Sequence, residues 1–402
     1  MDIRNCEVGV ASSHASDPYD AFEEITRAID PATLAGALMF CSHRYDRERL
    51  ARAARLWSME RFPMIGCTSS GELTEAGYDE DSISLIGFPS DEFHMVSHLF
   101  EDLTQFDAGS ARAAVRDLVA RAELGSANLR RKGGGPVDAP VNHAALFLVD
   151  GLSHSEELLA MTVQEALGEI PLVGGSSGDG MRFKETGIFS DGDFHPAVAA
   201  VAILSTRRPL HVFRRQHYKP GKLKMVVTGA DPGARCVTEI NAEPAAQEYL
   251  RLAGSPDADA AVIAGPLADP SRLDMTLFAA CPPMVRAGGD YHVRAVQAAN
   301  PDGSLTFYCA IDEGIVLTLG EPVDQIESLK ATMEDIRAAV GEVDHIIAFD
   351  CVLNRINAER RQIGRLVSEI YRRNGVVGFN TYGEQFHALH VNQTFSGLAI
   401  GR

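Results

Sequence analysis

The sequence has no long hydrophobic run. Nowhere do about 18 consecutive apolar residues occur, which is the length that a transmembrane helix needs. The first residues, Met1 to Cys6, also lack the basic-then-apolar layout of a secretory signal peptide. The 7 cysteines are scattered and odd in number, which suits free thiols better than a disulfide framework. We therefore expect a cytoplasmic protein.

Positive charge is also scarce. The chain has 37 Lys and Arg against 55 Asp and Glu, which gives a net charge of -18. Nucleic acids and anionic membrane surfaces are bound mainly through Lys and Arg. The charge balance therefore argues against a nucleic-acid-binding or membrane-surface protein, and its simplest consequence is solubility.

Apolar residues and an internal repeat are abundant. With 402 residues, 45% of them hydrophobic, the chain is long enough for two or three domains with sizeable cores. One unit occurs three times: an apolar run, a glycine, a small or polar stretch, and a second glycine followed by a carboxylate. The copies span residues 63–72, 171–180 and 375–384, and the second copy is one residue short at its last glycine.

The three copies share their context. An apolar run precedes each copy, at residues 37–40, 145–149 and 346–349. A helical period separates that run from the copy, and in the third copy it comprises Ile363, Leu366, Val367, Ile370 and Tyr371. Asp46 and Ser155 are the expected N-caps of the first two helices. We therefore predict a mixed α/β fold of repeated strand–helix–strand–Gly turn–strand units, forming mixed sheets covered by helices.

The remaining segments also have clear patterns. The unbroken apolar run 197–204 predicts a strand buried on both faces. Residues 125–142, which include three consecutive glycines, predict a surface loop. Further helices are expected at 20–29, 108–124, 246–252 and 324–340, and further strands at 82–88, 94–99, 210–218, 225–228, 292–296, 305–308, 314–318 and 393–400.

The second copy contains a G-x-S-x-G pattern centred on Ser176. Serine hydrolases need that serine on a sharp turn between a strand and a helix. The residues after Met181 have no helical pattern, and the other copies have Thr68 and Asn380 at the serine position. We therefore interpret the segment as a Gly-rich turn between strands. It also lacks the Lys-Ser/Thr pair of a phosphate-binding loop.

Two histidine pairs have spacings that invite comparison with metal sites. His94 and His98 lie in an expected strand, where residues four apart are separated by about 13 Å, too far to share a metal ion. His387 and His390 are closer, but their segment has a loop or strand pattern without a Cys or carboxylate pair at ligand spacing. Neither pair predicts a zinc site.

His195 is a candidate haem ligand. It follows Asp193 and Phe194 and stands at the start of the apolar run 197–204. A neutral imidazole beside apolar and aromatic walls suits axial ligation of haem iron, although a histidine at a strand start also fits a structural role. Cys281-Pro282 is a two-residue thiolate–haem pattern, and the chain has no C-x-x-C-H, so any haem would be bound without covalent attachment.

Four segments together resemble FIST-domain proteins, with both the N-terminal and the C-terminal FIST parts, over about residues 30–402. They are Ile65 to Glu72, Gly174 to Gly180, Val237 to Ala245 and Gly378 to Glu384. The closing run from Tyr382 to Phe395 is most similar to the bacterial haem-binding, nitric-oxide-sensing branch of that family. The resemblance implies an N-terminal domain at 1–232 and a C-terminal domain at 233–402.

The same resemblance implies a function without catalysis. It points to a cytoplasmic sensor that holds ferrous haem b through one histidine, binds nitric oxide, with carbon monoxide as a further gas, and regulates biofilm formation. The implied partner is a sensor histidine kinase, or a diguanylate cyclase or phosphodiesterase, and a homodimer is compatible with this role. His195 is the first choice for the metal ligand because Asp193-Phe194-His195 resembles a feature of the haem-binding branch. His390 and His387 are the alternatives, and His390 also resembles the histidine of the general FIST ending.

Two other functions stay open. The chain could bind a small polar metabolite, such as an amino acid, without haem, through backbone N–H groups of the Gly-rich turns near Ser176 or Thr381. It could also be an enzyme with Ser176 or Cys67 as nucleophile, although no His–carboxylate pair can be placed beside either residue.

Overall fold

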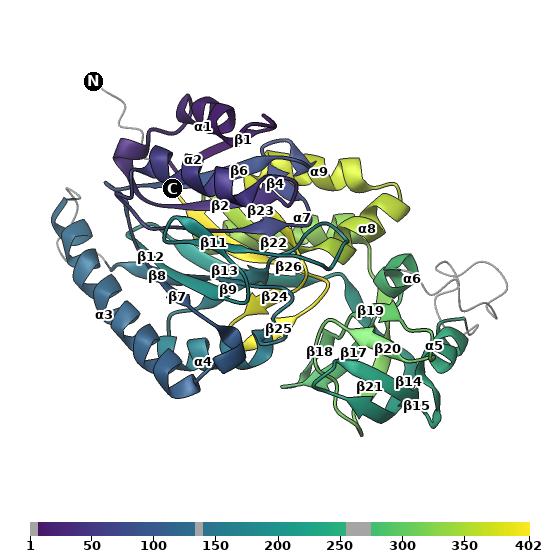
Figure 1. Cartoon of the computed structure of the whole chain (residues 1–402). Helices are drawn as coiled ribbons and strands as arrows, with labels where there is room; N and C mark the ends of the chain where they lie inside the picture. Colours follow the sequence, from purple (N-terminus) through teal and green to yellow (C-terminus); the bar gives the residue numbers. More distant parts are fainter. Residues whose placement is uncertain (1–6, 133–139, 255–274) are drawn as a thin grey trace.

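The computed structural model describes residues 7–132, 140–254 and 275–402. It confirms the mixed α/β class. A three-sheet body carries helices on its outside, and a smaller strand-rich part lies beside it (Figure 1).

The body consists of three six-stranded sheets with the same internal order. Sheet 1 is β1 (Gly9–Ser13), β6 (Ile83–Pro89), β2 (Leu34–Ser42), β3 (Met64–Ser69), β10 (Ile188–Ser190) and β11 (Asp193–His195). Sheet 2 is β7 (Phe93–Phe100), β12 (Ala199–Thr206), β8 (Asn142–Val149), β9 (Leu172–Ser176), β24 (Glu384–Phe386) and β25 (Leu389–Val391). Sheet 3 is β13 (Leu210–Gln216), β26 (Thr394–Gly401), β22 (Val343–Cys351), β23 (Val376–Thr381), β4 (Glu72–Thr74) and β5 (Gly77–Asp79).

Each sheet is completed by a hairpin from a different repeat. The central pair is parallel in every sheet (β2–β3, β8–β9 and β22–β23), as expected for strands joined through a helix. The short hairpin after each Gly-rich turn leaves its own repeat. Hairpin β4–β5 joins sheet 3, β10–β11 joins sheet 1, and β24–β25 joins sheet 2. The three repeats therefore form a closed ring of exchanged hairpins.

Helices cover the outer face of each sheet. Sheet 1 carries α1 (Pro18–Thr26) and α2 (Arg47–Ser58), sheet 2 carries α3 (Ala108–Lys132) and α4 (Glu156–Leu167), and sheet 3 carries α7 (Gln325–Val340), α8 (Val352–Arg360) and α9 (Gly364–Arg373). Asp46 caps α2 as predicted, because its side chain accepts a hydrogen bond from Arg49 N at 2.9 Å. Ser155 occupies the N-cap position of α4 but makes no capping bond with its side chain.

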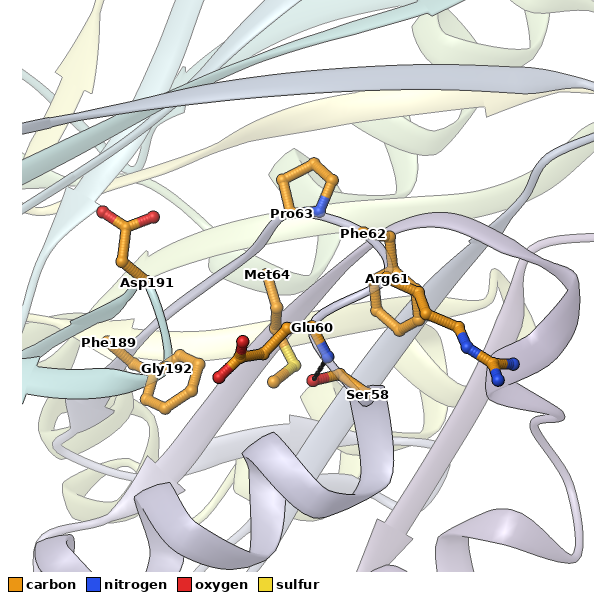
Figure 2. Close-up of a pocket in the computed structure, with 9 residues that line it drawn as sticks. All are labelled: Ser58, Glu60, Arg61, Phe62, Pro63, Met64, Phe189, Asp191 and Gly192. Carbon is orange, nitrogen blue, oxygen red and sulfur yellow. Dashed lines mark hydrogen bonds between the residues drawn. The ribbon is translucent and has the colours of Figure 1, made fainter.

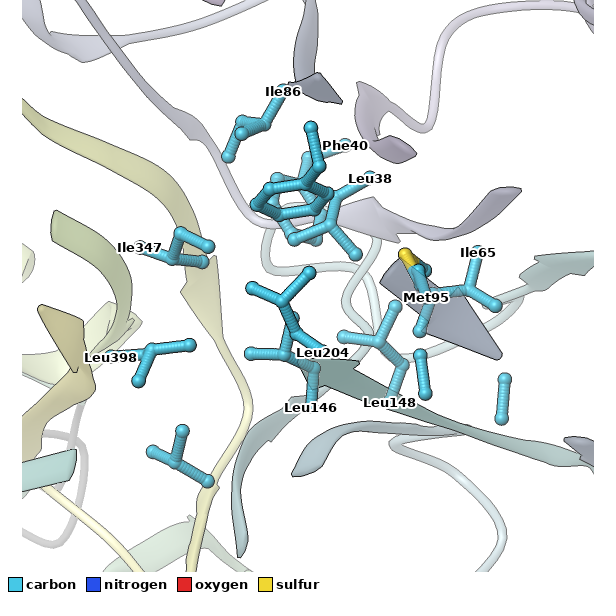
Figure 3. Packing of buried hydrophobic residues seen from close by; sticks show 14 of the residues in the cluster. Leu38, Phe40, Ile65, Ile86, Met95, Leu146, Leu148, Leu204, Ile347 and Leu398 are labelled. Carbon is cyan, nitrogen blue, oxygen red and sulfur yellow. The ribbon is translucent and has the colours of Figure 1, made fainter. Parts of the chain in front are cut away.

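The inner faces of the three sheets meet in one central core (Figure 3). In β2, Leu38 and Phe40 point into this core, while Met39 packs outward against the helices. Both faces of such a strand are buried, which explains its unbroken apolar sequence. The predicted doubly buried strand at 197–204 is confirmed as β12, all of whose residues are buried.

Residues 218–254 and 275–322 form the smaller part, as far as the structure describes it, inserted between β13 and α7. It contains α5 (Ala245–Ala253), α6 (Met275–Ala280) and an eight-stranded sheet of β14 (Tyr218–Asp231), β15 (Cys236–Ile240), β16 (Glu243–Pro244), β17 (Pro283–Ala287), β18 (Asp290–Val293), β19 (Val296–Ala299), β20 (Leu305–Phe307) and β21 (Val316–Pro322). It has its own hydrophobic core. The division predicted between residues 232 and 233 lies within this part, in the β14–β15 connection, and the chain after residue 322 returns to the body.

The loop predicted from residue 125 is wrong over its first part. Helix α3 continues through Gly125 to Lys132, and residues 133–139 lie outside the described chain. Gly125 faces His94 on β7, and a Cβ added to it would lie 1.8 Å from His94 Nε2. The glycine therefore makes room for a neighbouring side chain and does not end the helix. The strand predicted at 225–228 is confirmed, and it is part of the longer strand β14.

Candidate functional site

The Gly-rich turns lie where the third strand of each repeat leaves its sheet. The first glycine of each copy packs against a carbonyl of the adjacent parallel strand. A Cβ would lie 2.1 Å from Met39 O at Gly66, 1.8 Å from Phe147 O at Gly174, and 1.9 Å from the backbone oxygen of the neighbouring strand at the third copy. No side chain fits at these positions, so the glycines are required for strand packing.

The turns interlock through their own backbones. Asn380 N donates to Gly71 O at 2.7 Å, and Ser176 N donates to Gly383 O at 2.8 Å. Gly178 N donates to an oxygen of the first turn at 3.0 Å. These N–H groups are therefore occupied within the protein, which removes the basis for a carboxylate cradle made of them.

Two of the carboxylates that follow the turns are equivalent buried acids. Glu72 accepts hydrogen bonds from Ser82 N at 3.2 Å and Ser82 Oγ at 3.0 Å. Glu384 accepts from Thr394 N at 3.0 Å and Thr394 Oγ1 at 2.7 Å. Burial raises the pKa of Glu72 to about 7 and that of Glu384 to about 8. Each acid ties its turn to the last strand of its own repeat.

Asp179, the carboxylate of the second copy, has a different environment. It accepts from the backbone N–H groups of Phe183 at 2.8 Å, Lys184 at 2.9 Å and Glu185 at 2.9 Å, and from the hydroxyl of Tyr382. Burial favours a higher pKa for Asp179, but these hydrogen bonds outweigh it and lower the pKa. The ionised carboxylate therefore orders residues 183–185.

The exchanged hairpins are equivalent in register but not in chemistry. In each hairpin the middle residues of the two strands pair with each other. The pairs are Leu73–Tyr78 in β4–β5, Phe189–Phe194 in β10–β11 and Gln385–His390 in β24–β25. The first two pairs pack into the helix-side cores of sheets 3 and 1. The hydroxyl of Tyr78 donates to Asp350 at 2.7 Å, but its ring packs in that core. The third hairpin therefore places an amide and an imidazole where the fold elsewhere places aliphatic or aromatic side chains.

Gln385 and His390 are deeply buried, with 0% and 4% of their surfaces exposed. Gln385 Nε2 donates to Ser176 Oγ at 2.9 Å and lies 3.1 Å from His390 Nδ1. Because an amide NH₂ can only donate, His390 Nδ1 accepts, and the proton of the neutral imidazole is on Nε2. Burial lowers the pKa of His390, which keeps the ring neutral at pH 7.

Three polar atoms of this region have no partner among the described residues: Gln385 Oε1, His390 Nε2 and Asn392 Nδ2. A Cβ on Gly383 would lie 3.0 Å from His390 Nε2 and 3.1 Å from Asn392 Nδ2, so these two nitrogens face the same point. We call Gln385, His390 and Asn392 the polar cluster. Buried polar atoms are normally paired, so an unpaired group of this kind marks a candidate ligand site.

The inserted part closes one side of the polar cluster. Ala295 N donates to Asn392 Oδ1 at 3.3 Å, and Arg294 Nη1 donates to His390 O at 3.3 Å. Arg235, also from the inserted part, donates to Glu156 at 2.6 Å and to Glu157 at 2.8 Å on α4. The cluster therefore lies at the junction of the two parts of the chain.

The structure separates the histidines that the sequence offered as iron ligands. His195 ends β11 in sheet 1, is half-buried, and has Nε2 3.2 Å from Ser190 O. His390 is on β25 in sheet 2, and His387 is exposed in the turn between β24 and β25. Within the described residues no group of three or more His, Cys, Asp or Glu side chains could hold a metal ion. A single axial imidazole remains the available form of iron ligation.

His94 and His98 are on strand β7, as predicted. Cys67 is buried, and burial raises the pKa of its thiol well above the ordinary value. Ser176 is buried in β9, its hydroxyl contacts the amide of Gln385, and no helix follows it. Neither nucleophile has the activated environment that covalent catalysis needs.

A separate hollow of about 450 Å³ lies between the end of α2 and the β10–β11 turn (Figure 2). Its lining residues are Ser58, Glu60, Arg61, Phe62, Pro63, Met64, Phe189, Asp191 and Gly192. The lining contains no imidazole, so it does not fit axial ligation of haem. None of the candidate ligands His195, His387 and His390 opens into it.

The polar cluster was only partly visible in the sequence. His390 was a candidate, but Gln385 and Asn392 were not. Alignment of the first and third copies places Gln385 opposite Leu73, one residue after the shared Gly-carboxylate pair. The replacement of an apolar residue by a polar one between two aligned copies was the signal that the sequence contained. The pairing of Gln385 with His390 could be known only from the register of the β24–β25 hairpin.

Comparison with known proteins agrees with the repeat pattern. The FIST N domain family matches residues 35–243, and the FIST C domain family matches residues 245–387. A search of curated proteins found no match. No helix in the described ranges is long and apolar enough to cross a membrane. FIST domains are sensory modules of signalling proteins that bind small ligands, and this chain belongs to the FIST family.

Proposed function

We propose that this chain is a cytoplasmic sensory module that detects a small ligand at the polar cluster of Gln385, His390 and Asn392. The observation that supports this proposal is the pair of polar side chains at the middle positions of the third hairpin. Two of the three equivalent hairpins fill their paired positions with aliphatic or aromatic side chains, and the third fills them with Gln385 and His390. Each buried polar atom without a partner costs about 1–3 kcal/mol, and a ligand that pairs with these atoms offsets that cost.

The position of the cluster supports a signalling role. Asn392 and the backbone of His390 bond to Ala295 and Arg294 of the inserted part. A ligand that pairs with the cluster changes the free energy of this junction. The two parts of the chain would then respond together, which supplies the two-state element that a sensor needs.

The specific sensor that we propose is haem-based, responds to nitric oxide, and reports to a histidine kinase or a cyclic-di-GMP enzyme. His390 supports it with a buried imidazole whose Nδ1 is held and whose Nε2 is unpartnered among the described residues. Reversing the Gln385 amide makes its oxygen the acceptor of Nδ1–H and leaves a lone pair on Nε2, the form that a metal requires. When bound, the haem iron would supply the centre that binds the gas.

His195 is the second ligand that we propose to test. One of its ring nitrogens lies 3.2 Å from the carbonyl of Ser190. Metal-ligating histidines commonly have one nitrogen bonded to a carbonyl and the other on the metal. Its half-exposed position on an edge strand makes it less enclosed than His390.

The test is an absorption spectrum of the purified protein after haem addition, in the ferrous state, with and without nitric oxide. Wild type, His195→Ala, His390→Ala and His387→Ala are compared. A Soret band that moves with nitric oxide and is lost in one variant supports the haem sensor and identifies the ligand. No specific haem uptake would refute the haem form.

A parallel thermal-shift assay tests the cluster without haem. The twenty free amino acids are added to wild type and to His390→Phe. Stabilisation of wild type that His390→Phe abolishes supports a polar-metabolite sensor at the same site. Equal responses of both proteins, together with no histidine-dependent haem uptake, would refute the cluster as the ligand site.

A further inference from the structure

Arg214 and Arg215 are neighbours on β13 with different surroundings. Arg215 donates to Asp335 on α7 and to Thr332 Oγ1 at 2.9 Å. Arg214 points to the other face of the strand, where its Nη1 donates to His292 Nδ1 at 2.8 Å. Among the described residues, no carboxylate lies within 4.0 Å of the Arg214 guanidinium.

His292 cannot balance this charge. Its Nδ1 accepts from Arg214, and its Nε2 lies 3.2 Å from Ala287 O, where it donates. Both ring nitrogens are therefore used by a neutral imidazole that is only 6% exposed. Burial lowers the pKa of Arg214, although Asp290 opposes that shift from beyond ion-pair distance. Arg214 thus carries a partly buried charge without a direct counter-ion.

The surroundings hold the Arg214 guanidinium in one orientation. Its central carbon lies 5.4 Å from the ring centroid of Phe386, a cation–π contact that fixes the plane of the group. The bond to His292 fixes its position within that plane. The other N–H groups of Arg214 remain available in the planar fork that matches two oxygens of a carboxylate or phosphate.

Both Arg214 and the imidazole of His387 contact the ring of Phe386. His387 follows Phe386 in the β24–β25 turn, and their rings are 4.4 Å apart. His387 is exposed. Partial burial of its ring is the larger cause of its lowered pKa, and the positive charge of Arg214 is the smaller one. The half-buried Arg294 also has no carboxylate within 4.0 Å in the described chain, and it too influences the pKa of His292. In a chain of net charge -18, Arg214 and Arg294 are therefore two neighbouring cations without an ion pair in the described chain.

We propose that Arg214, held by His292 and Phe386 and flanked by His387, is a binding site for a small oxyanion, either a carboxylate or a phosphate group. Phe386 follows Gln385 in β24, so the site lies on the face of the hairpin opposite to the Gln385–His390 pair. It is separate from the polar cluster, because it uses none of Gln385 Oε1, His390 Nε2 and Asn392 Nδ2, and it shares only His387 with the candidate iron ligands.

Isothermal titration with inorganic phosphate and with malonate, each at constant ionic strength, tests the proposal. Wild type and the matched control Arg215→Gln are expected to bind at least one of the two anions saturably. Arg214→Gln is expected to lose about tenfold or more in affinity, because it removes the charge-assisted hydrogen bonds. Arg214→Lys retains the charge but not the fork and is expected to lose less.

The two probes separate the possible anions. Binding of phosphate alone assigns a phosphate site, and binding of malonate alone assigns a carboxylate site. His387→Ala, an exposed change that leaves the fold intact, is expected to weaken binding several-fold. Equal titrations of Arg214→Gln and Arg215→Gln, or a response no different from that to sodium chloride, would overturn the proposal. The haem spectra and the thermal shifts with His390→Phe are unaffected by either result.

Discussion

Replacing the polar pair of the third hairpin by the apolar pair of the others should separate stability from function. The double variant Gln385→Leu/His390→Phe gives β24–β25 side chains like those of the other two hairpins. If the polar pair serves a ligand, the variant should fold at least as well as wild type and should lose the ligand response. Sites that break a local packing rule are expected to serve function at a cost in stability.

The change in the free energy of unfolding follows from the polar atoms and contacts that the double variant removes or adds. Removal of the unpartnered Gln385 Oε1 and His390 Nε2 relieves about 1–3 kcal/mol each. Ser176 Oγ loses the hydrogen bond from Gln385, which costs about 1 kcal/mol. The backbone of Gly383 lies close to the His390 ring, since a Cβ added to Gly383 would be 2.4 Å from His390 Cε1. The larger Phe ring at position 390 therefore adds an overpacking cost of about 1–3 kcal/mol. The expected net change in the free energy of unfolding therefore lies between a loss of about 2 kcal/mol and a gain of about 4 kcal/mol, with its midpoint at a gain of about 1 kcal/mol.

Urea unfolding followed by the fluorescence of Trp57 measures this change, because it is the one tryptophan of the chain and is packed between α2 and sheet 1. The matched control is the reverse exchange, Leu73→Gln/Tyr78→His in β4–β5. It buries polar groups in the helix-side core of sheet 3, removes the hydrogen bond from the Tyr78 hydroxyl to Asp350, and should cost about 3 kcal/mol or more. A loss of more than about 2 kcal/mol in Gln385→Leu/His390→Phe would refute the reasoning, because the polar pair would then be a structural network.

Four further changes test the surrounding structure. Gly174→Ala should prevent folding or cost several kcal/mol, since its Cβ would lie 1.8 Å from a carbonyl oxygen. Gly364→Ala, with its nearest neighbour at 4.0 Å, should be neutral by thermal denaturation. Arg235→Met should leave the buried Glu156 carboxylate unpaired, which costs about 3–5 kcal/mol in the free energy of unfolding, and should increase protease cleavage between the two parts. Unchanged cleavage would contradict the idea that the Arg235–Glu156 ion pair holds the two parts together. Glu384 has a pKa near 8 when folded and an ordinary value of 4.5, so its stabilising contribution is complete below pH 4.5 and falls as the pH rises to about 8. Glu384→Gln should flatten that fall in melting curves between pH 5 and 9, and an unchanged slope would exclude Glu384 as its source.

Much of the local structure could be predicted from the sequence. The repeated unit, the helix behind Asp46 and the doubly buried strand at 197–204 all follow from patterns within short windows. Helical period, caps and apolar runs act between residues close in the chain, so a linear sequence displays them. The Gly-rich turns between strands were predicted from the repeated motif, but Gly174 itself lies in strand β9, where only glycine permits the close contact with β8.

Other features depend on residues that are far apart in the chain. Gly125 lies inside α3 because His94 packs against it, and no local signal marks that contact. The hairpins leave their own repeats and complete other sheets, so the bonded neighbours of His390 are Gln385 on β24 and Arg294 in the inserted part. Such placement is decided by tertiary packing.

The sequence by itself determined the class of fold, the three repeats and the family, since these depend on local periodicity and on short motifs. Only the tertiary structure decided which polar residues form a candidate site. Burial and hydrogen-bond satisfaction belong to the folded chain, and a glutamine opposite a leucine in two aligned repeats acquires meaning only when both are found buried. The exchange of hairpins between sheets creates that burial, because it carries the polar pair of β24–β25 out of its own repeat and against α4 and the inserted part.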